Sequence, residues 1–170
     1  MIGAKMAHNR TAEQANYWQT TVHPAKSQTE IIELLENFGT SNMIISQGRA
    51  NDQPAWMIRF EWRAAVYRFT FVPLHCHDPL KESSFGGKRR KHSDQAYYQM
   101  GRIAVNFIKA VLTAAETNPD ALFGFVELPG AATHQGDLPM TAAELGIERL
   151  TATLPPIKFP SLLRSQNPQK

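Results

Sequence analysis

Two neighbouring stretches, residues 55–62 (AWMIRFEW) and residues 65–72 (AVYRFTFV), decide the fold. In both, large apolar side chains recur at every second position, which is the period of a β-strand with one buried face. Arg63 and Ala64 predict a tight connection between them, and Pro73 ends the second strand. We therefore expect an antiparallel hairpin whose aromatic face is packed in the core rather than used to stack bases. The side chains expected on that face are Trp56, Ile58, Phe60, Trp62, Tyr67, Phe69 and Phe71.

Two amphipathic helices are expected to cover this face. Ser27 and Glu30 have the spacing of a capping box, and an apolar stripe follows them as far as Gly39, so we predict a helix over 28–38. A second helix is predicted over 93–116, with Ser93 as its cap. The two stripes consist of Ile31, Leu34, Leu35 and Phe38 in the first helix, and of Ala96, Met100, Ile103, Ala104, Phe107, Val111, Leu112 and Ala115 in the second.

The remaining segments give weaker signals. Residues 16–22 (NYWQTTV) alternate and contain strand formers, so we predict a short first strand there, and another over 41–46 (SNMIIS). Residues 121–128 (ALFGFVEL) fit either a short strand or an amphipathic turn. A short helix is expected after Thr141, which has Glu144 three residues further on.

The expected order of elements is therefore β-α-β-β-β-α with short C-terminal elements. This order predicts an α+β fold: a two-layer sandwich in which an antiparallel sheet of three to four strands is covered on one face by two helices. We expect a mobile segment over 1–15, a single domain over 16–150 and a proline-containing extended tail over 151–170. Residues 79–92 lack periodicity and predict a flexible basic loop inside the domain.

Composition excludes several classes of protein. A chain of 170 residues with 42% hydrophobic and 19% charged residues fits one water-soluble domain. No apolar run approaches the roughly 20 residues that cross a bilayer. Cys76 is the sole cysteine, which precludes an internal disulfide, and the opening residues lack the apolar core of a signal peptide. The expected location is the cytoplasm, with no membrane partner.

Positive charge is concentrated in one part of the sequence. Residues 48–92 carry nine Lys or Arg against four Asp or Glu, a balance of +5, whereas residues 27–47 carry three Glu and no cation. Four consecutive cations, KRRK at 88–91, directly precede the second helix, whose first N–H groups also attract anions. This arrangement favours a polyanionic partner such as nucleic acid, although a solvated surface loop is the ordinary alternative.

Part of the chain resembles a known family. Residues 20–44 (TTVHPAKSQTEIIELLENFGTSNMI), followed by a Trp- and Arg-bearing hairpin and a basic loop before a long helix, resemble an uncharacterised family of small phage, prophage and bacterial proteins. Its marks are a threonine-rich strand and a helix with the pattern K-S-x-x-E-I-x-x-L-L, and the resemblance spans about residues 17–157. The long helix departs from the family because it lacks a Trp- and Arg-rich start. The resemblance implies the architecture and a mobile-element setting, but no catalytic residues.

A looser likeness concerns topology alone. A helix, three strands and a helix with basic residues at its start is the layout of double-stranded RNA-binding domains, which grip phosphates across a groove. The predicted first strand and the glutamates of the first helix, Glu30, Glu33 and Glu36, depart from that layout. We treat this likeness as an analogy.

The leading hypothesis is a small non-enzymatic protein that binds nucleic acid, DNA or RNA, through its phosphates with little sequence specificity and without a cofactor. The chain lacks phosphate-binding and nucleophile-elbow motifs, so no enzyme class is indicated. The candidate binding residues are Lys88, Arg89, Arg90, Lys91, Arg59, Arg63, Arg68 and Arg102, with Tyr97 and Tyr98 as stacking candidates.

Two alternatives stay open. The first is a protein–protein interaction module that docks a partner on the tail or on the acidic helix. The second is a metal-dependent hydrolase, because His75, Cys76, His77 and Asp78 are all of types that bind transition metals. Alternate positions in an extended chain point at most two of these side chains the same way, so a third ligand must come from elsewhere.

Overall fold

A computed structural model describes residues 10–50, 52–130 and 138–146 of the chain. Helix α1 (Pro24–Phe38) is followed by the strands β1 (Ser41–Ala50), β2 (Gln53–Trp62) and β3 (Ala65–Phe71). These strands form an antiparallel sheet in the order β1-β2-β3. A two-stranded hairpin, β4 (Glu82–Phe85) and β5 (Lys88–Lys91), comes next, and then helix α2 (His92–Thr117). A 3₁₀ helix, η1 (Ala12–Gln14), lies before α1, and a second, η2 (Pro119–Phe125), lies after α2.

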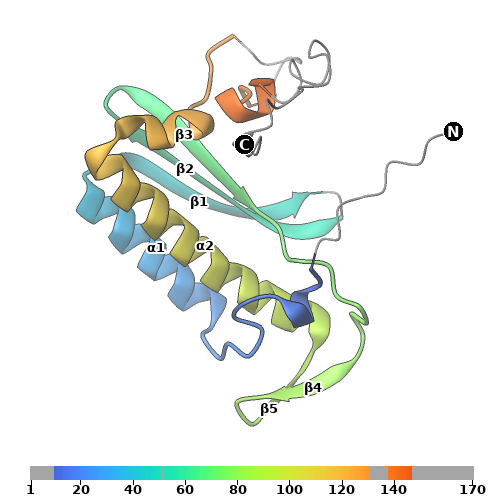
Figure 1. Ribbon diagram of the computed structural model, residues 1–170. Helices are drawn as coiled ribbons and strands as arrows, with labels where there is room; N and C mark the ends of the chain where they lie inside the picture. The colour runs from blue at the N-terminus through green and yellow to red at the C-terminus, as the bar shows by residue number, and fades with distance from the viewer. Residues whose placement is uncertain (1–9, 51, 131–137, 147–170) are drawn as a thin grey trace, which may run out of the picture.

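The α+β fold and its two layers are confirmed. Helices α1 and α2 run side by side across one face of the three-stranded sheet (Figure 1). The predicted aromatic face of the sheet is in the core, where Trp56, Ile58 and Phe60 have no exposed surface. The tight connection is confirmed as well: Arg63 and Ala64 both have positive φ, 49° and 61°, as a two-residue turn between twisted strands requires.

Helix α1 begins four residues earlier than predicted. Pro24 occupies the first turn, where its missing N–H costs nothing, and His23 caps the helix by accepting at Nδ1 from the N–H of Ala25 at 3.2 Å. The predicted cap by Ser27 is therefore wrong, because this residue lies inside the helix and is fully buried. The predicted end at Gly39 is confirmed by its left-handed φ of 83°.

Ser27 marks the point where the two helices come closest. A Cβ added to Gly101 of α2 would lie 3.1 Å from the Ser27 Cβ and 3.1 Å from Cη2 of Trp56. Two small side chains thus let both helices approach each other directly above the Trp56 indole. Any larger residue at Gly101 separates the helices or displaces the indole.

The expected flexible loop over 79–92 contains the β4–β5 hairpin, so that prediction is wrong. The reason is the turn Gly86–Gly87, in which both residues have positive φ, 58° and 80°. Such a turn matches the twist of the strands that it joins. On the inner face of the hairpin, Phe85 is buried and meets Trp18 edge to face at 5.3 Å. Helix α2 then starts at His92, with Lys91 rather than Ser93 at the cap position.

The strand predicted over 16–22 is also wrong, and so is the mobile segment for residues 10–15. Ala12 is fully buried, and Tyr17 turns the chain with a φ of 66°. Two buried amides of α2 replace the missing strand partners. Gln95 donates to the carbonyls of Trp18 and Thr20 at 2.6 and 2.8 Å, and Gln99 donates to the carbonyls of Ala12 and Asn16 at 2.9 and 2.7 Å.

The segment after η2 returns along the outer edge of β3. Val126 bridges Tyr67, and the N–H of Glu127 donates to the Val66 carbonyl at 2.8 Å. The stretch 121–128 therefore combines both predicted alternatives, a helical turn followed by a strand-like bridge. The capping box at Thr141 is confirmed, since its N–H donates to Glu144 at 2.7 Å. The proline-containing tail over 151–170 lies outside the described residues.

We expect Gly101→Leu to lower the free energy of unfolding by about 1–3 kcal/mol, because the added side chain must enter the contact between Ser27 and Trp56. The measurement is urea denaturation followed by circular dichroism. The matched control is Ala110→Leu, which adds a larger side chain at an exposed position of the same helix. Equal midpoints for the two variants would show that the helices are not held this closely.

Candidate functional site

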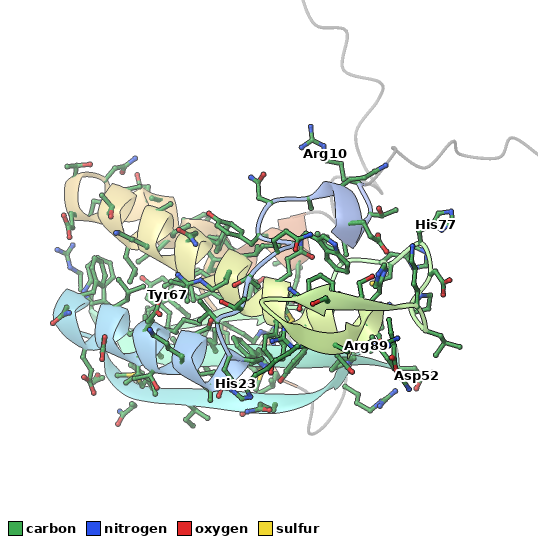
Figure 2. All side chains as sticks on the ribbon, turned by 90° about the horizontal axis from the view of Figure 1, so that it is seen from below. Arg10, His23, Asp52, Tyr67, His77 and Arg89 are labelled. Atoms are coloured by element: carbon green, nitrogen blue, oxygen red, sulfur yellow. The ribbon has the colours of Figure 1, made fainter. Side chains whose placement is uncertain are left out.

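The four consecutive cations form strand β5, one half of the β4–β5 hairpin, which we call the arm (residues 82–91). The arm extends past the start of α2 and away from the three-stranded sheet (Figure 1). It carries four cations against the single acid Glu82. Lys88, Arg89 and Lys91 are exposed, and the label of Arg89 in Figure 2 marks this basic surface. Arg89 lies 3.3 Å from Glu82, an exposed pair that leaves 78% of the arginine side chain accessible.

Arg90 differs from its three neighbours because it points inward. Its Nη1 donates to Oε1 of Gln95 at 2.5 Å, and its guanidinium carbon lies 4.0 Å from the centre of the Tyr98 ring. The Tyr98 ring also packs against His23 in a T-shaped arrangement, with the two ring centres 5.4 Å apart. Within the described residues, no carboxylate lies within ion-pair distance of Arg90. The site thus holds a guanidinium that is fixed by a hydrogen bond and an aromatic ring and that makes no ion pair within the described residues.

A cavity of about 750 Å³ opens at the base of the arm, beside Arg90. Its walls come from the start of β2, the connection between β3 and β4, and the first turns of α2. Most of the lining is apolar or aromatic, and the polar groups are few. The lining residues are Gln53, Pro54, Pro73, Leu74, His75, Cys76, Pro79, Arg90, Ser93, Asp94, Ala96, Tyr97 and Tyr98.

Tyr97, one of the two predicted stacking residues, is held by the core. Its hydroxyl accepts from Nε1 of Trp56 at 2.7 Å and donates to Gln47 of β1 at 3.2 Å. Tyr97 and Tyr98 are both half-buried and both line the cavity. Both tyrosines therefore lie beside Arg90, as their position close to the cations in the sequence had indicated.

The other predicted arginines do not join the arm. Arg102 pairs with Glu30 of α1 at 2.6 Å. Arg63 lies in the β2–β3 turn, over the ring of Trp62 at 4.3 Å, at the end of the sheet away from the arm in Figure 1. Arg59 and Arg68 face each other across β2 and β3. The candidate binding residues Arg59, Arg63, Arg68 and Arg102 therefore do not form one continuous surface with the cations of the arm.

Glu127 explains how two facing arginines are tolerated. Its side chain is 3% exposed and accepts from Arg59 at 3.0 and 2.7 Å, while Arg68 lies 3.8 Å away and also pairs with Glu144 at 2.7 Å. The hydrogen bonds and charge of Glu127 raise the pKa of Arg59, so this guanidinium stays charged. Arg59, Arg68 and Arg102 already form ion pairs with glutamates, so we exclude them from the candidate surface for binding nucleic acid.

A hydrogen-bonded chain fixes the arm to the body of the domain. Oε1 of Glu13 lies 3.1 Å from Nδ1 of His92, and Nε2 of His92 lies 2.9 Å from the hydroxyl oxygen of Ser83. Because a carboxylate only accepts, Nδ1 donates to Glu13, and a neutral imidazole then accepts from Ser83. The order of serine, histidine and carboxylate is that of an acyl-transfer triad. None of the three lines the cavity, however, so we assign them the role of joining η1, β4 and α2.

Glu13 is kept ionised by its partners. Burial raises its pKa, but this effect is outweighed by hydrogen bonds from backbone N–H groups, Thr11 and His92, which lower the pKa to about 2. The nearby Cys76 shows the opposite result, because burial and the charge of Glu13 raise the pKa of its thiol to about 11. Its Sγ donates to the carbonyl of His92 at 3.3 Å. Cys76 is therefore a protonated, structural thiol at neutral pH.

The candidate metal ligands diverge. His75 lines the cavity, the N–H of His77 donates to Glu13 at 3.1 Å, and Asp78 accepts from the N–H of Lys81 at 3.2 Å. Among the described residues, no three His, Cys, Asp or Glu side chains converge as a metal site would require. In the same parts of the chain, no helix is long and apolar enough to span a bilayer.

Comparison of the chain with protein-family models, curated proteins and solved structures gives no significant match. Both resemblances drawn from the sequence therefore stay predictions. Sequence reasoning named Arg90, Tyr97 and Tyr98 as candidates, and all three line the cavity, but it missed the cavity itself, whose walls come from three separate segments. It also missed the chain formed by Glu13, His92 and Ser83, because the glutamate lies far from the other two in sequence.

Glu13→Gln tests the attachment of the arm. The folded state holds the pKa of this carboxyl at about 2, below its ordinary value of 4.5, so its stabilisation is complete above about pH 4.5 and disappears as the pH falls towards 2. We expect the variant to be less stable by about 1–2 kcal/mol at pH 7, and the difference to shrink at pH 3. Urea denaturation at both pH values measures it.

The control is Glu33→Gln, which removes an exposed carboxylate of α1. It should leave stability within about 0.5 kcal/mol of the wild type at both pH values. A destabilisation by Glu13→Gln that is the same at pH 7 and pH 3 would contradict the assigned role of the ionised carboxylate.

Proposed function

We propose that the protein binds nucleic acid through the arm, with contacts directed mainly to phosphates and little preference for sequence. The observation that carries the proposal is the position of the four cations. They form a strand of a hairpin that leaves the body of the domain, where Lys88, Arg89 and Lys91 are exposed. A two-stranded ribbon of this kind is one of the elements that enter the grooves of nucleic acid.

Rigidity of the arm supports the proposal. Phe85 and His92 pack on Trp18. The hydrogen bonds of His92 with Ser83 and with Glu13 fix the hairpin at a second point. Cations on a fixed ribbon lose less conformational freedom on binding than cations on a loose loop. The activity proposed is binding alone, with no cofactor and no catalytic step.

The order of helix, three strands and helix offers further support. Without the predicted first strand, the described elements follow the layout of double-stranded RNA-binding domains, with the arm inserted before the last helix. The proposed setting, a phage or other mobile element and the cytoplasm, rests on the resemblance of residues 17–157 alone. The interaction-module and metal-hydrolase hypotheses remain alternatives without a specific contact in their favour.

The test is a salt series of binding to fluorescein-labelled 20-mers, single- and double-stranded, measured by anisotropy. We expect Lys88→Ser/Arg89→Ser to weaken binding at least tenfold in low salt. The slope of log K against log salt should fall by about 0.7–0.9 for each phosphate that the variant no longer neutralises. The matched control, Arg63→Ser/Lys109→Ser, removes one Arg and one Lys at exposed positions away from the arm.

Equal weakening by both double variants would mean that net charge alone drives binding and would contradict a role of the arm. Failure of the wild-type protein to bind any of the oligonucleotides in low salt would refute the proposed function itself.

A further inference from the structure

We propose that the cavity at the base of the arm holds an unpaired nucleobase, so that the preferred ligand is single-stranded nucleic acid. This inference rests on the proposed function and extends it from the phosphates to the bases. The cavity and the arm are continuous, because Arg90 belongs to β5 and also lines the cavity.

The size and lining of the cavity fit a planar aromatic ligand. A volume of about 750 Å³ lies within the range of roughly 300–1,000 Å³ that small-molecule sites occupy. Tyr97, Tyr98 and three prolines, Pro54, Pro73 and Pro79, line it. Rigid apolar walls of this kind suit a base, because every base has a flat face that stacks favourably on aromatic side chains.

Arg90 is positioned to receive the negative charge of such a ligand. Its guanidinium is held by Gln95 and by the Tyr98 ring, and it has no carboxylate partner among the described residues. Gln95 is itself fixed, because its amide donates to the carbonyls of Trp18 and Thr20. The guanidinium is thus prepared for a phosphate at the mouth of the cavity, or for stacking beneath a base.

Asp94 supplies the complementary polar group. It lines the same cavity, is exposed, and makes no ion pair within the described parts of the chain. A carboxylate accepts hydrogen bonds from the amino groups of bases, whereas a phosphate or another acid is repelled by it. The combination of Arg90 and Asp94 therefore favours a ligand with both an anionic group and N–H donors, as a nucleotide has.

Access of the bases to the cavity decides which class of nucleic acid the protein prefers. Bases in a duplex are stacked and paired, so they do not reach a cavity at the base of a hairpin. A binder of phosphates alone favours the duplex, because its charge density is higher than that of a single strand. A cavity that binds an unpaired base should instead make the affinity for a single strand higher than the affinity for a duplex.

The experiment compares wild type with Ser93→Trp and His75→Trp, which place a large side chain into the cavity from two different walls. Both positions are exposed, and Ser93→Ala and His75→Ala are the controls for removal of the native side chains. Thermal unfolding verifies that each variant is folded. The probes are a single-stranded 20-mer of mixed sequence and the corresponding DNA and RNA duplexes.

We expect the wild type to bind the single strand more tightly than either duplex. Each Trp variant should lower single-strand affinity at least tenfold with an unchanged salt slope, and leave duplex affinity unaltered. Preference of the wild type for a duplex would overturn the base-binding inference while the arm proposal survives. Trp variants that both bind the single strand as the wild type does would overturn it too, whereas absence of all binding by the wild type would refute both proposals.

Discussion

The contact of Trp56 with the two helices is the interaction on which the other elements depend. The indole is fully buried beneath Ser27 and Gly101, the two small residues that let α1 and α2 approach each other. Its N–H is satisfied by Tyr97, whose hydroxyl continues to Gln47 at the edge strand. One side chain therefore sets the spacing of the helices, ties α2 to β1 and orients a wall of the cavity. An indole serves this purpose because it combines a large apolar surface with a single donor.

The first turns of α2 hold the arm and the N-terminal segment in place through buried polar side chains. Within two turns, His92, Gln95 and Gln99 each bind a segment that is distant in sequence. These polar residues are buried because they satisfy backbone carbonyls and a carboxylate that would otherwise lack partners. The arm and the N-terminal segment are therefore held by directed hydrogen bonds as much as by apolar contact. Arg90 therefore keeps one orientation, because the Gln95 side chain that accepts its hydrogen bond is itself fixed.

Patterns with a fixed period were predictable from the sequence, and contacts between distant segments were not. Alternation over 55–72 and the apolar stripe of the long helix predicted the sheet, its buried face and its cover. The hairpin of the arm was missed because residues 79–92 lack periodicity, although the Gly86–Gly87 pair is typical of a tight turn between two strands. The prediction of a strand over 16–22 was wrong because backbone carbonyls of this segment accept hydrogen bonds from glutamine side chains of α2 rather than from a neighbouring strand. No spacing rule links Glu127 to Arg59 or Glu13 to His92, so these contacts could be found only in the structure.

The opposed arginines of β2 and β3 have a consequence for the order of assembly. Until Glu127 and Glu144 dock, Arg59 and Arg68 face each other without the carboxylates that separate their charges. Like charges directly opposite destabilise a strand pair, so the pairing of β2 with β3 is weaker while these carboxylates are absent. Docking of the polypeptide after η2 therefore adds to the stability of the sheet, because it brings both carboxylates to the opposed arginines. Opening of this segment would return the two guanidinium groups to direct opposition and thereby weaken the pairing of β2 with β3.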